Sequence, residues 1–276
     1  AGIKPTYGLV SRCGIFPLAF SLDTAGPLAW TTEDCALILG ALADHDPNDQ
    51  ASAKAPAVDY GAAAQRSIKG MRIALARSWY EGPDGELSPD MASGMDDAVR
   101  VLRDLGAIVD EVSFPDIRDY HICGRVIITT EAHAIHRRDV IERPEKFGYT
   151  TRRRFQLGAF ISAEQYLSAL RFRRKLHQDT REAMRGYDLV MTANHWGAPE
   201  IFEEPQTIFH FLGKPSLTMP FNVTGQPAAT VCCGFSADGL PLAFQLAGRA
   251  FDEASVFAAG AAYERATPWR SRRPTL

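Results

Sequence analysis

The stretch from Ser216 to Glu253 constrains the fold most, because two apolar runs, a turn and a helix start follow one another within it. The runs Ala228–Phe235 and Pro241–Ala247 flank Asp238-Gly239, a dipeptide that readily takes the positive φ values of a tight hairpin. Asp252 then stands where an N-cap would, and apolar and small residues follow it at helical spacing. The sequence therefore predicts a buried antiparallel pair of strands with a helix lying flat on it.

The composition is that of a globular chain. With 276 residues, 46% of them hydrophobic, the chain can bury roughly three quarters of its unfolded surface. It has no apolar run of about 18 residues and no basic-then-apolar leader, so we expect a cytoplasmic protein without membrane contact. A net charge of −3 gives no field that would gather nucleic acid, and we expect no such partner. The five cysteines lack a C-x-x-C pair, which predicts reduced and mostly buried thiols.

The middle of the chain begins with a strand–helix–strand pattern. Met71–Ala76 and Ile108–Val112 are short apolar runs, and Ser88-Pro89-Asp90 supplies an N-cap, a proline at N1 and an early acid for a helix through Leu105. At these lengths the pattern indicates a βαβ unit, which requires a parallel pair and a right-handed crossover.

Three further helices are predicted from spacing and caps. The spacing is helical from Asp116 to about Ile141, and a capping box at Ser162 starts a long helix that runs to about Arg185. Thr31 or Thr32 caps an earlier helix. Its predicted buried face, at i, i+3, i+4 and i+7, consists of Cys35, Ile38, Leu39 and Leu42.

These elements predict an α/β protein with a mixed, mostly parallel sheet covered by helices, together with a smaller α/β subdomain. The stretch 44–60 is polar, rich in Ala and Pro and without periodicity, so we place a boundary there. Residues 1–60 are predicted to be a core segment and residues 61–186 the smaller subdomain over a cleft. Residues 187–276 are predicted to return to the core sheet with the C-terminal hairpin and helix.

Segments at both ends of the chain carry a family resemblance. Near the C-terminus these are Pro220–Pro227, Cys233–Pro241 and Gln245–Glu253, and near the N-terminus they are Gly2–Gly8 and Ser21–Pro27. They resemble the amidase signature family, whose members hydrolyse or transfer carbon–nitrogen amide bonds. The resemblance implies an amidase signature-like α/β/α fold.

The resemblance also places candidate site residues. In the family, the counterparts of Ser21 and Asp23 lie beside the catalytic centre, where these residues would support a loop. Asp23 can do so by accepting backbone N–H bonds, although an Asx-turn with no chemical duty stays open. The counterpart of the helix after Val126 lines the family's substrate cleft, so Thr129, Thr130 and Glu131 are expected to face ligand.

Two further groups are candidates for substrate contacts. An arginine near this point in the family reaches a substrate carboxylate, which makes Arg153 or Arg154 the candidate here, since a guanidinium fork matches a carboxylate. His210 and Phe211 belong to an aromatic group that either walls a pocket or packs in the core.

A metal site and a nucleic-acid surface are weaker interpretations. His133 and His136 share a helix face and, with Glu131, suggest metal ligands, but no H-E-x-x-H and no further ligand at suitable spacing appears. We predict no metal and no cofactor. The basic residues Arg171–Lys175 are predicted to form a solvated helix face.

The family's own catalytic residues are a serine nucleophile, a second serine in a cis peptide and a neutral lysine. The serines lie in Gly-Gly-Ser-Ser-Gly and Asp-Thr-Gly-Gly-Ser stretches, whereas this sequence contains no Gly-Gly dipeptide and opens in mid-motif at Ala1. We therefore assign no catalytic residue within the chain and expect a truncated chain, inactive alone, with a missing N-terminal segment or a companion chain.

We therefore interpret the chain as the C-terminal part of an amidase-type hydrolase that works through a serine acyl-enzyme. In this interpretation the chain shapes the pocket for a small-molecule amide. A homodimer stays open. Two alternatives remain: a non-catalytic or degenerate family member that acts as a binding partner, and an amidotransferase subunit that delivers ammonia to a partner enzyme on transfer RNA.

Overall fold

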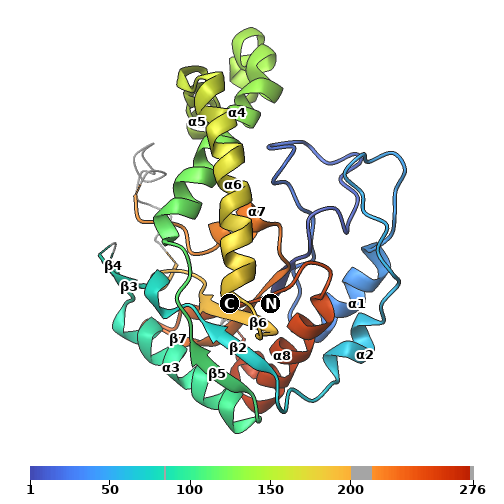
Figure 1. The fold of residues 1–276 in the computed structure, drawn as a ribbon, viewed down its shortest axis with the longest axis vertical. Coiled ribbons are helices and arrows are strands. Elements are labelled where there is room, and N and C mark those ends of the chain that lie inside the picture. The colour runs from blue at the N-terminus through green and yellow to red at the C-terminus, as the bar shows by residue number, and fades with distance from the viewer. Residues whose placement is uncertain (84, 200–212, 274–276) are drawn as a thin grey trace.

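A single six-stranded sheet forms the centre of the computed structural model, which describes residues 1–83, 85–199 and 213–273 (Figure 1). The strand order is β1-β7-β8-β6-β2-β5. Strands β2, β5, β6 and β7 run one way, and β1 and β8 run the other. The strands are β1 (Gly2–Lys4), β2 (Arg72–Leu75), β5 (Ile108–Glu111), β6 (Leu189–Ala193), β7 (Ala228–Phe235) and β8 (Pro241–Gly248). The predicted α/β class with a mixed sheet is confirmed.

The C-terminal hairpin forms as predicted. β7 and β8 pair antiparallel, and the turn between them is closed by a hydrogen bond from the Ser236 N–H to the Leu240 carbonyl at 2.8 Å. Gly239 takes a φ of +79°, a conformation that costs little without a Cβ. One register shift between Cys232 and Gly234 bends β7 near this turn.

Helix α8 (Glu253–Ala266) packs on this hairpin, as its small residues predicted. The Asp252 side chain accepts a hydrogen bond from the Ser255 N–H and caps the helix. A Cβ added at Gly260 would lie 3.3 Å from the Val231 side chain and 3.0 Å from Thr32. A side chain at this position would crowd Val231 of the sheet and Thr32 of α1, so glycine favours this close packing.

The predicted βαβ unit is also present. β2 and β5 pair parallel, and α3 (Pro89–Asp104) connects them with Ser88 as its N-cap. Helices α3 and α8 both contact the hairpin strands β7 and β8. In Figure 1 α3 lies at the lower left of the sheet, and α8, α1 and α2 lie to its right.

Three helices form an arm above the sheet in Figure 1: α4 (Ile117–Glu142), α5 (Tyr149–Gln156) and α6 (Ala163–Ala183). The predicted capping box at Ser162 starts α6, with Gln165 as its partner. The sequence interpretation missed α5, because its basic run Arg152–Arg154 shows no apolar periodicity. A short helix, α7 (Met219–Thr224), packs between α4 and α6 and was missed as well.

The predicted buried face of α1 (Thr32–Leu42) was partly wrong. Ile38 is 41% exposed and Leu42 45% exposed, whereas Cys35, Ala36 and Leu39 are buried. The helix contacts α2 (Tyr60–Ala64) and α8. The small Ala36 fits there, so the buried face is rotated away from the bulkier Ile38 and Leu42.

The remaining short elements lie outside the central sheet. They are the strand pair β3 (Glu81–Gly82) and β4 (Gly85–Glu86) and the 3-10 turns Arg77–Trp79, Pro144–Lys146, Leu157–Phe160 and Trp269–Ser271. None of the helices within the described ranges is long and apolar enough to cross a membrane.

The predicted division at residues 60 and 186 stays a prediction. β2 and β5, from the middle segment, lie in the same sheet as the strands from both ends of the chain. The outer edge of β1 is covered by residues 27–29, where the Ile3 N–H donates to the Pro27 carbonyl at 3.1 Å and the Ala29 N–H to the Ala1 carbonyl at 3.1 Å. Part of that edge is therefore not open to another strand.

Two buried carboxylates of α8 hold the N-terminal segment. Glu253 Oε1 accepts hydrogen bonds from the Thr6 N–H at 2.8 Å and the Thr6 hydroxyl at 2.5 Å. Glu264 accepts from the Thr32 N–H and the Thr32 hydroxyl, both at 2.8 Å. The second contact satisfies one of the N–H groups that the first turn of α1 leaves without a helical partner.

We predict that Glu264→Ala lowers the free energy of unfolding by about 2–4 kcal/mol, because it leaves the buried Thr32 groups without a partner. Glu264→Gln can accept from the N–H and donate to the hydroxyl, so it should cost less than about 1 kcal/mol. Urea unfolding at pH 7 measures both. The control is Glu182→Ala, which removes only an exposed pair with Arg185.

The pH dependence gives a second readout of the same contact. Burial raises the pKa of Glu264 above its ordinary value of 4.5. The folded form then holds this proton more tightly than the unfolded chain, so the contribution of Glu264 to stability increases as the pH falls from the folded pKa toward 4.5. Glu264→Gln should remove that part of the pH profile, and an unchanged profile would contradict the assignment.

Candidate functional site

A buried carboxylate on α4 fixes the segment that carries Ser21. Glu131 is 6% exposed. Its Oε2 accepts from the Ser21 N–H at 3.0 Å and its Oε1 from the Ser21 hydroxyl at 2.8 Å. These two residues are 110 positions apart in the chain. Glu131 thus contacts a neighbouring segment of the protein directly.

Two side chains of α6 extend this contact. The Tyr166 hydroxyl donates to Glu131 Oε1 at 2.7 Å, and the pKa of Tyr166 rises to about 12 through burial and then through this carboxylate. Arg173 donates from Nη2 to the Ser21 carbonyl at 2.9 Å and from Nε to the Val223 carbonyl at 2.7 Å. One network therefore joins α4, α6, α7 and the Ser21 segment, and we call it the Glu131 network.

Asp23 belongs to the same segment and binds its backbone. Its Oδ2 accepts from the Leu18 N–H at 2.8 Å and the Ala19 N–H at 2.9 Å. These are the backbone hydrogen bonds that the sequence led us to expect of Asp23. Its position beside a catalytic centre stays a prediction.

An aromatic stack joins the segment to the arm as well. The His136 ring lies between the rings of Phe16 and Phe155, with centroids at 4.7 and 4.8 Å and interplanar angles of 14° and 11°. His136 Nε2 lies 2.7 Å from the Pro17 carbonyl, and His133 Nδ1 lies 3.0 Å from that of Phe155.

The two histidines and Glu131 thus engage three different partners. Among the residues that the structure describes, no group of three His, Cys, Asp or Glu residues is arranged to hold a metal ion.

Thr129 and Thr130 are occupied with helix packing. Thr129 is buried, and its backbone carbonyl packs closely against Gly158. A Cβ added to Gly158 would lie 2.4 Å from the Thr129 carbonyl oxygen. The Thr130 hydroxyl donates back to the Val126 carbonyl at 2.7 Å. Contact of either residue with a ligand stays a prediction.

The structure distinguishes the two candidate arginines. The exposed Arg153 guanidinium lies over the Tyr149 ring at 5.4 Å. Arg154 is half-buried and lies toward α4, since burial and the charge of Arg154 together lower the pKa of Arg125 to about 10. Arg125 on α4 and Arg154 on α5 therefore lie close enough for their charges to interact.

His210 and Phe211 lie outside the described residues. A cavity of about 310 Å³ is lined partly by Asp23, Ile15 and Phe20. Arg12 and Asp49 also line it, and the ion pair between them, at 3.1 Å, holds the pKa of Asp49 well below its ordinary value.

The cysteines of the hairpin are poor nucleophiles, as expected from their position in a buried strand. Burial raises the pKa of Cys233 to about 12 and also raises that of Cys232.

Comparison with known proteins places the chain in a family. A family model described as Amidase matches residues 1–257. The chain belongs to the amidase family. This confirms the predicted resemblance. The resemblance rests on motifs at the two ends of the chain, whereas the family match extends across the middle as well.

Curated amidase-family relatives include a glutamyl-tRNA(Gln) amidotransferase subunit from Chloroflexus aggregans, 36% identical over 304 residues. The corresponding subunit from Gloeobacter violaceus is 35% identical over 310 residues. In both comparisons the match covers 100% of this chain and 61% of the relative. The chain therefore spans less than two thirds of the length of these relatives.

Solved structures agree on the fold. The glutamyl-tRNA(Gln) amidotransferase subunit from Thermotoga maritima is 31% identical with a TM-score of 0.79, over 97% of this chain and 58% of that chain. A structure described as a vestigial protein complex that reveals the origins of an s-triazine catabolic enzyme gives a TM-score of 0.83 at 28% identity, over 96% of this chain and 58% of that one.

We predict that Glu131→Ala releases the segment that it holds. Hydrogen–deuterium exchange at residues 18–22 should become at least roughly tenfold faster. The reason is that local opening of the segment no longer requires the charge-assisted hydrogen bonds to Ser21 to be broken. Tyr166→Phe should have a smaller effect in the same direction.

The matched control is Glu142→Ala, on the same helix, which removes only an exposed pair with Arg138. Exchange in β7 and β8 should stay unchanged in all three variants. Equal exchange at residues 18–22 in the wild-type protein and Glu131→Ala would show that Glu131 does not hold the segment.

Proposed function

We propose that this chain is the substrate-shaping part of an amidase-family enzyme that cleaves a carbon–nitrogen amide bond through a serine acyl-enzyme. The observation that carries the proposal is the family match over residues 1–257 of a sequence that contains no Gly-Gly dipeptide. The nucleophilic serine would then come from a missing N-terminal segment or a companion chain. The relatives' greater length supports such an additional part.

The Glu131 network gives this chain a defined role in that reaction. An amide-cleaving site needs its walls fixed to within a fraction of an ångström, since loosely held groups lose much of the advantage of proximity. Glu131, Tyr166 and Arg173 hold the Ser21 segment from two helices, and Asp23 fixes its backbone. In the proposed enzyme, these residues position the wall beside the nucleophile and do not touch the reacting atoms.

The arginines between α4 and α5 support a substrate that carries an acidic group. A guanidinium fork binds a carboxylate through two parallel hydrogen bonds, and a second cation nearby strengthens that preference. Arg154, with Arg125 as its neighbour, fits this role better than the exposed Arg153.

A second candidate function is that of an amidotransferase subunit. The relatives that favour it are named as subunits of a glutamyl-tRNA(Gln) amidotransferase and match the whole of this chain at 33–36% identity. In this case the released ammonia would pass to a partner chain. Co-purification of a second subunit would favour this function over a free-standing hydrolase. A cytoplasmic location and a homodimer stay predictions.

We predict that Arg154→Ala, in the chain joined to its nucleophile-bearing part, raises KM for acidic amides by roughly tenfold or more and leaves neutral amides within about twofold. Arg153→Ala is the matched control, because it removes the same charge one position away without affecting Arg125. Steady-state kinetics on paired acidic and neutral amides measure the difference. Equal effects of the two variants, or equal effects on both substrates, would contradict the role of Arg154.

We also predict that the 276-residue chain alone hydrolyses no amide above the buffer rate, because a pre-aligned nucleophile supplies most of the acceleration. A panel of simple amides tests this, followed by addition of the Gly-Gly-Ser segment as a separate chain. Turnover that appears only after the addition supports the proposal. Turnover by the chain alone that a substitution within it abolishes would overturn the proposal.

A further inference from the structure

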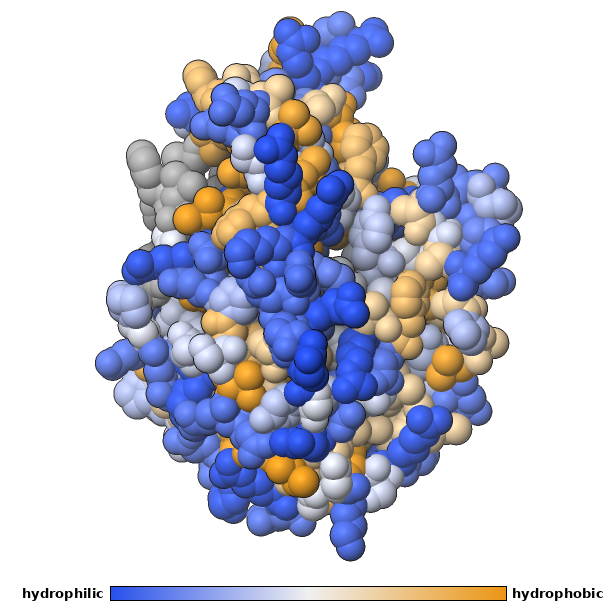
Figure 2. Space-filling model, viewed as in Figure 1, coloured by the Kyte–Doolittle hydropathy of each residue, from blue (hydrophilic) through white to orange (hydrophobic). Residues whose placement is uncertain are grey.

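A cavity lies at the C-terminal end of α6, at the opposite end of that helix from Tyr166. Its volume is about 830 Å³. The last turns of α6 line it, together with Gln226, shortly before β7, and Arg249, directly after β8. Figure 2 shows hydrophilic side chains over this part of α6.

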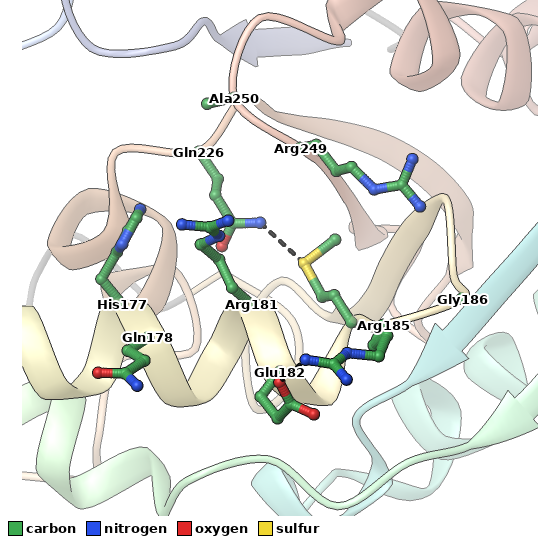
Figure 3. Close-up of a pocket in the computed structure, with 10 residues that line it drawn as sticks. His177, Gln178, Arg181, Glu182, Arg185, Gly186, Gln226, Arg249 and Ala250 are labelled. Carbon is green, nitrogen blue, oxygen red and sulfur yellow. Dashed lines mark hydrogen bonds and ion pairs between the residues drawn. The ribbon is translucent and has the colours of Figure 1, made fainter.

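Three arginines dominate the charge of this cavity. Arg185 pairs with Glu182 at 2.5 Å, and Arg249 lies 3.8 Å from Asp188 and donates to the Tyr187 carbonyl at 2.5 Å. Arg181 has no ion pair with any residue in the described ranges. Figure 3 shows its guanidinium beside Gln226, with His177 on one side. The lining thus carries an unneutralised positive charge.

The neutral partners around Arg181 leave its charge unopposed. Gln226 Nε2 donates to the Gly248 carbonyl at 2.8 Å and to Met184 Sδ at 3.0 Å, which fixes the amide in place. Burial, followed by the charges of Arg181 and Arg173, lowers the pKa of His177 below its ordinary value of 6.5. The lining is therefore short of negative charge around Arg181.

We propose that this cavity is a binding site for an oxyanion with two or more negative charges, of the phosphate class. A guanidinium fork matches two oxygens of such a group, and Arg181 and Arg249 face the cavity from two different elements. The cavity exceeds the volume of one phosphate several times, so a diphosphate or a phosphorylated small molecule fits it. His177 gains a favourable interaction when it is protonated beside the bound anion.

The test is titration calorimetry of the 276-residue chain with inorganic pyrophosphate at low salt. Arg181→Ala should weaken binding roughly tenfold, which corresponds to about 1.4 kcal/mol, while Arg181→Lys, which keeps the charge without the fork, should lie in between. The matched control is Arg174→Ala, an exposed position on the same helix outside the cavity. Thermal unfolding of each variant checks that the fold is kept.

A second arm uses sulfate, which stays a dianion between pH 7.5 and 5.5, so that only the protein titrates. The charged groups around His177 are Arg173 and Arg181 on α6 and Arg249 across the cavity, and the lining also holds the Glu182–Arg185 ion pair. A bound anion raises the His177 pKa, so affinity should increase as the pH falls through the bound-state pKa, and His177→Gln should remove that increase.

The outcomes decide the proposal. Saturable pyrophosphate binding that Arg181→Ala weakens and Arg174→Ala does not would support the site. Absence of saturable binding, or equal weakening by both variants, would overturn it, because the basic face would then attract anions without a defined site.

Discussion

The same contact, in which a buried glutamate accepts hydrogen bonds from one Ser or Thr, attaches the N-terminal segment of this protein to the rest of the fold at three points. In each of three places the carboxylate accepts both the backbone N–H and the side-chain hydroxyl of one Ser or Thr. The pairs are Glu253 with Thr6, Glu131 with Ser21, and Glu264 with Thr32. A carboxylate is costly to bury without partners, so each pair fixes one point of a segment that has little regular structure of its own.

The location of these contacts connects the fold to the proposed function. Two of them attach the segment to α8, which lies on the C-terminal hairpin, and the third attaches it to the helical arm through the Glu131 network. Both ends of the segment, at Thr6 and Thr32, are therefore attached to α8, and its middle, at Ser21, is attached to the arm. In the proposed enzyme, this would give the wall of the substrate site a fixed place relative to the sheet.

The sequence predicted the elements that have local signals. The C-terminal hairpin, the βαβ unit and the cap of α6 follow from periodicity, turn residues and capping boxes, all within a few residues. The glutamate contacts join residues 110 to 247 positions apart and leave no local pattern, so the sequence did not predict the contact between Glu131 and Ser21. The predicted contact of Glu131 with ligand stays a prediction. The buried face of α1 was misplaced because the pattern favours bulky residues, whereas the packing selects Ala36 over Ile38.

The most direct test of the central claim is mass spectrometry of the native protein, captured from its own cells with an antibody to residues 163–183. The account predicts peptides with a Gly-Gly-Ser sequence, either in the same polypeptide before Ala1 or in a chain that co-purifies in equal amount. Native protein that consists of this chain without any such peptide, and that still cleaves amides, would contradict it.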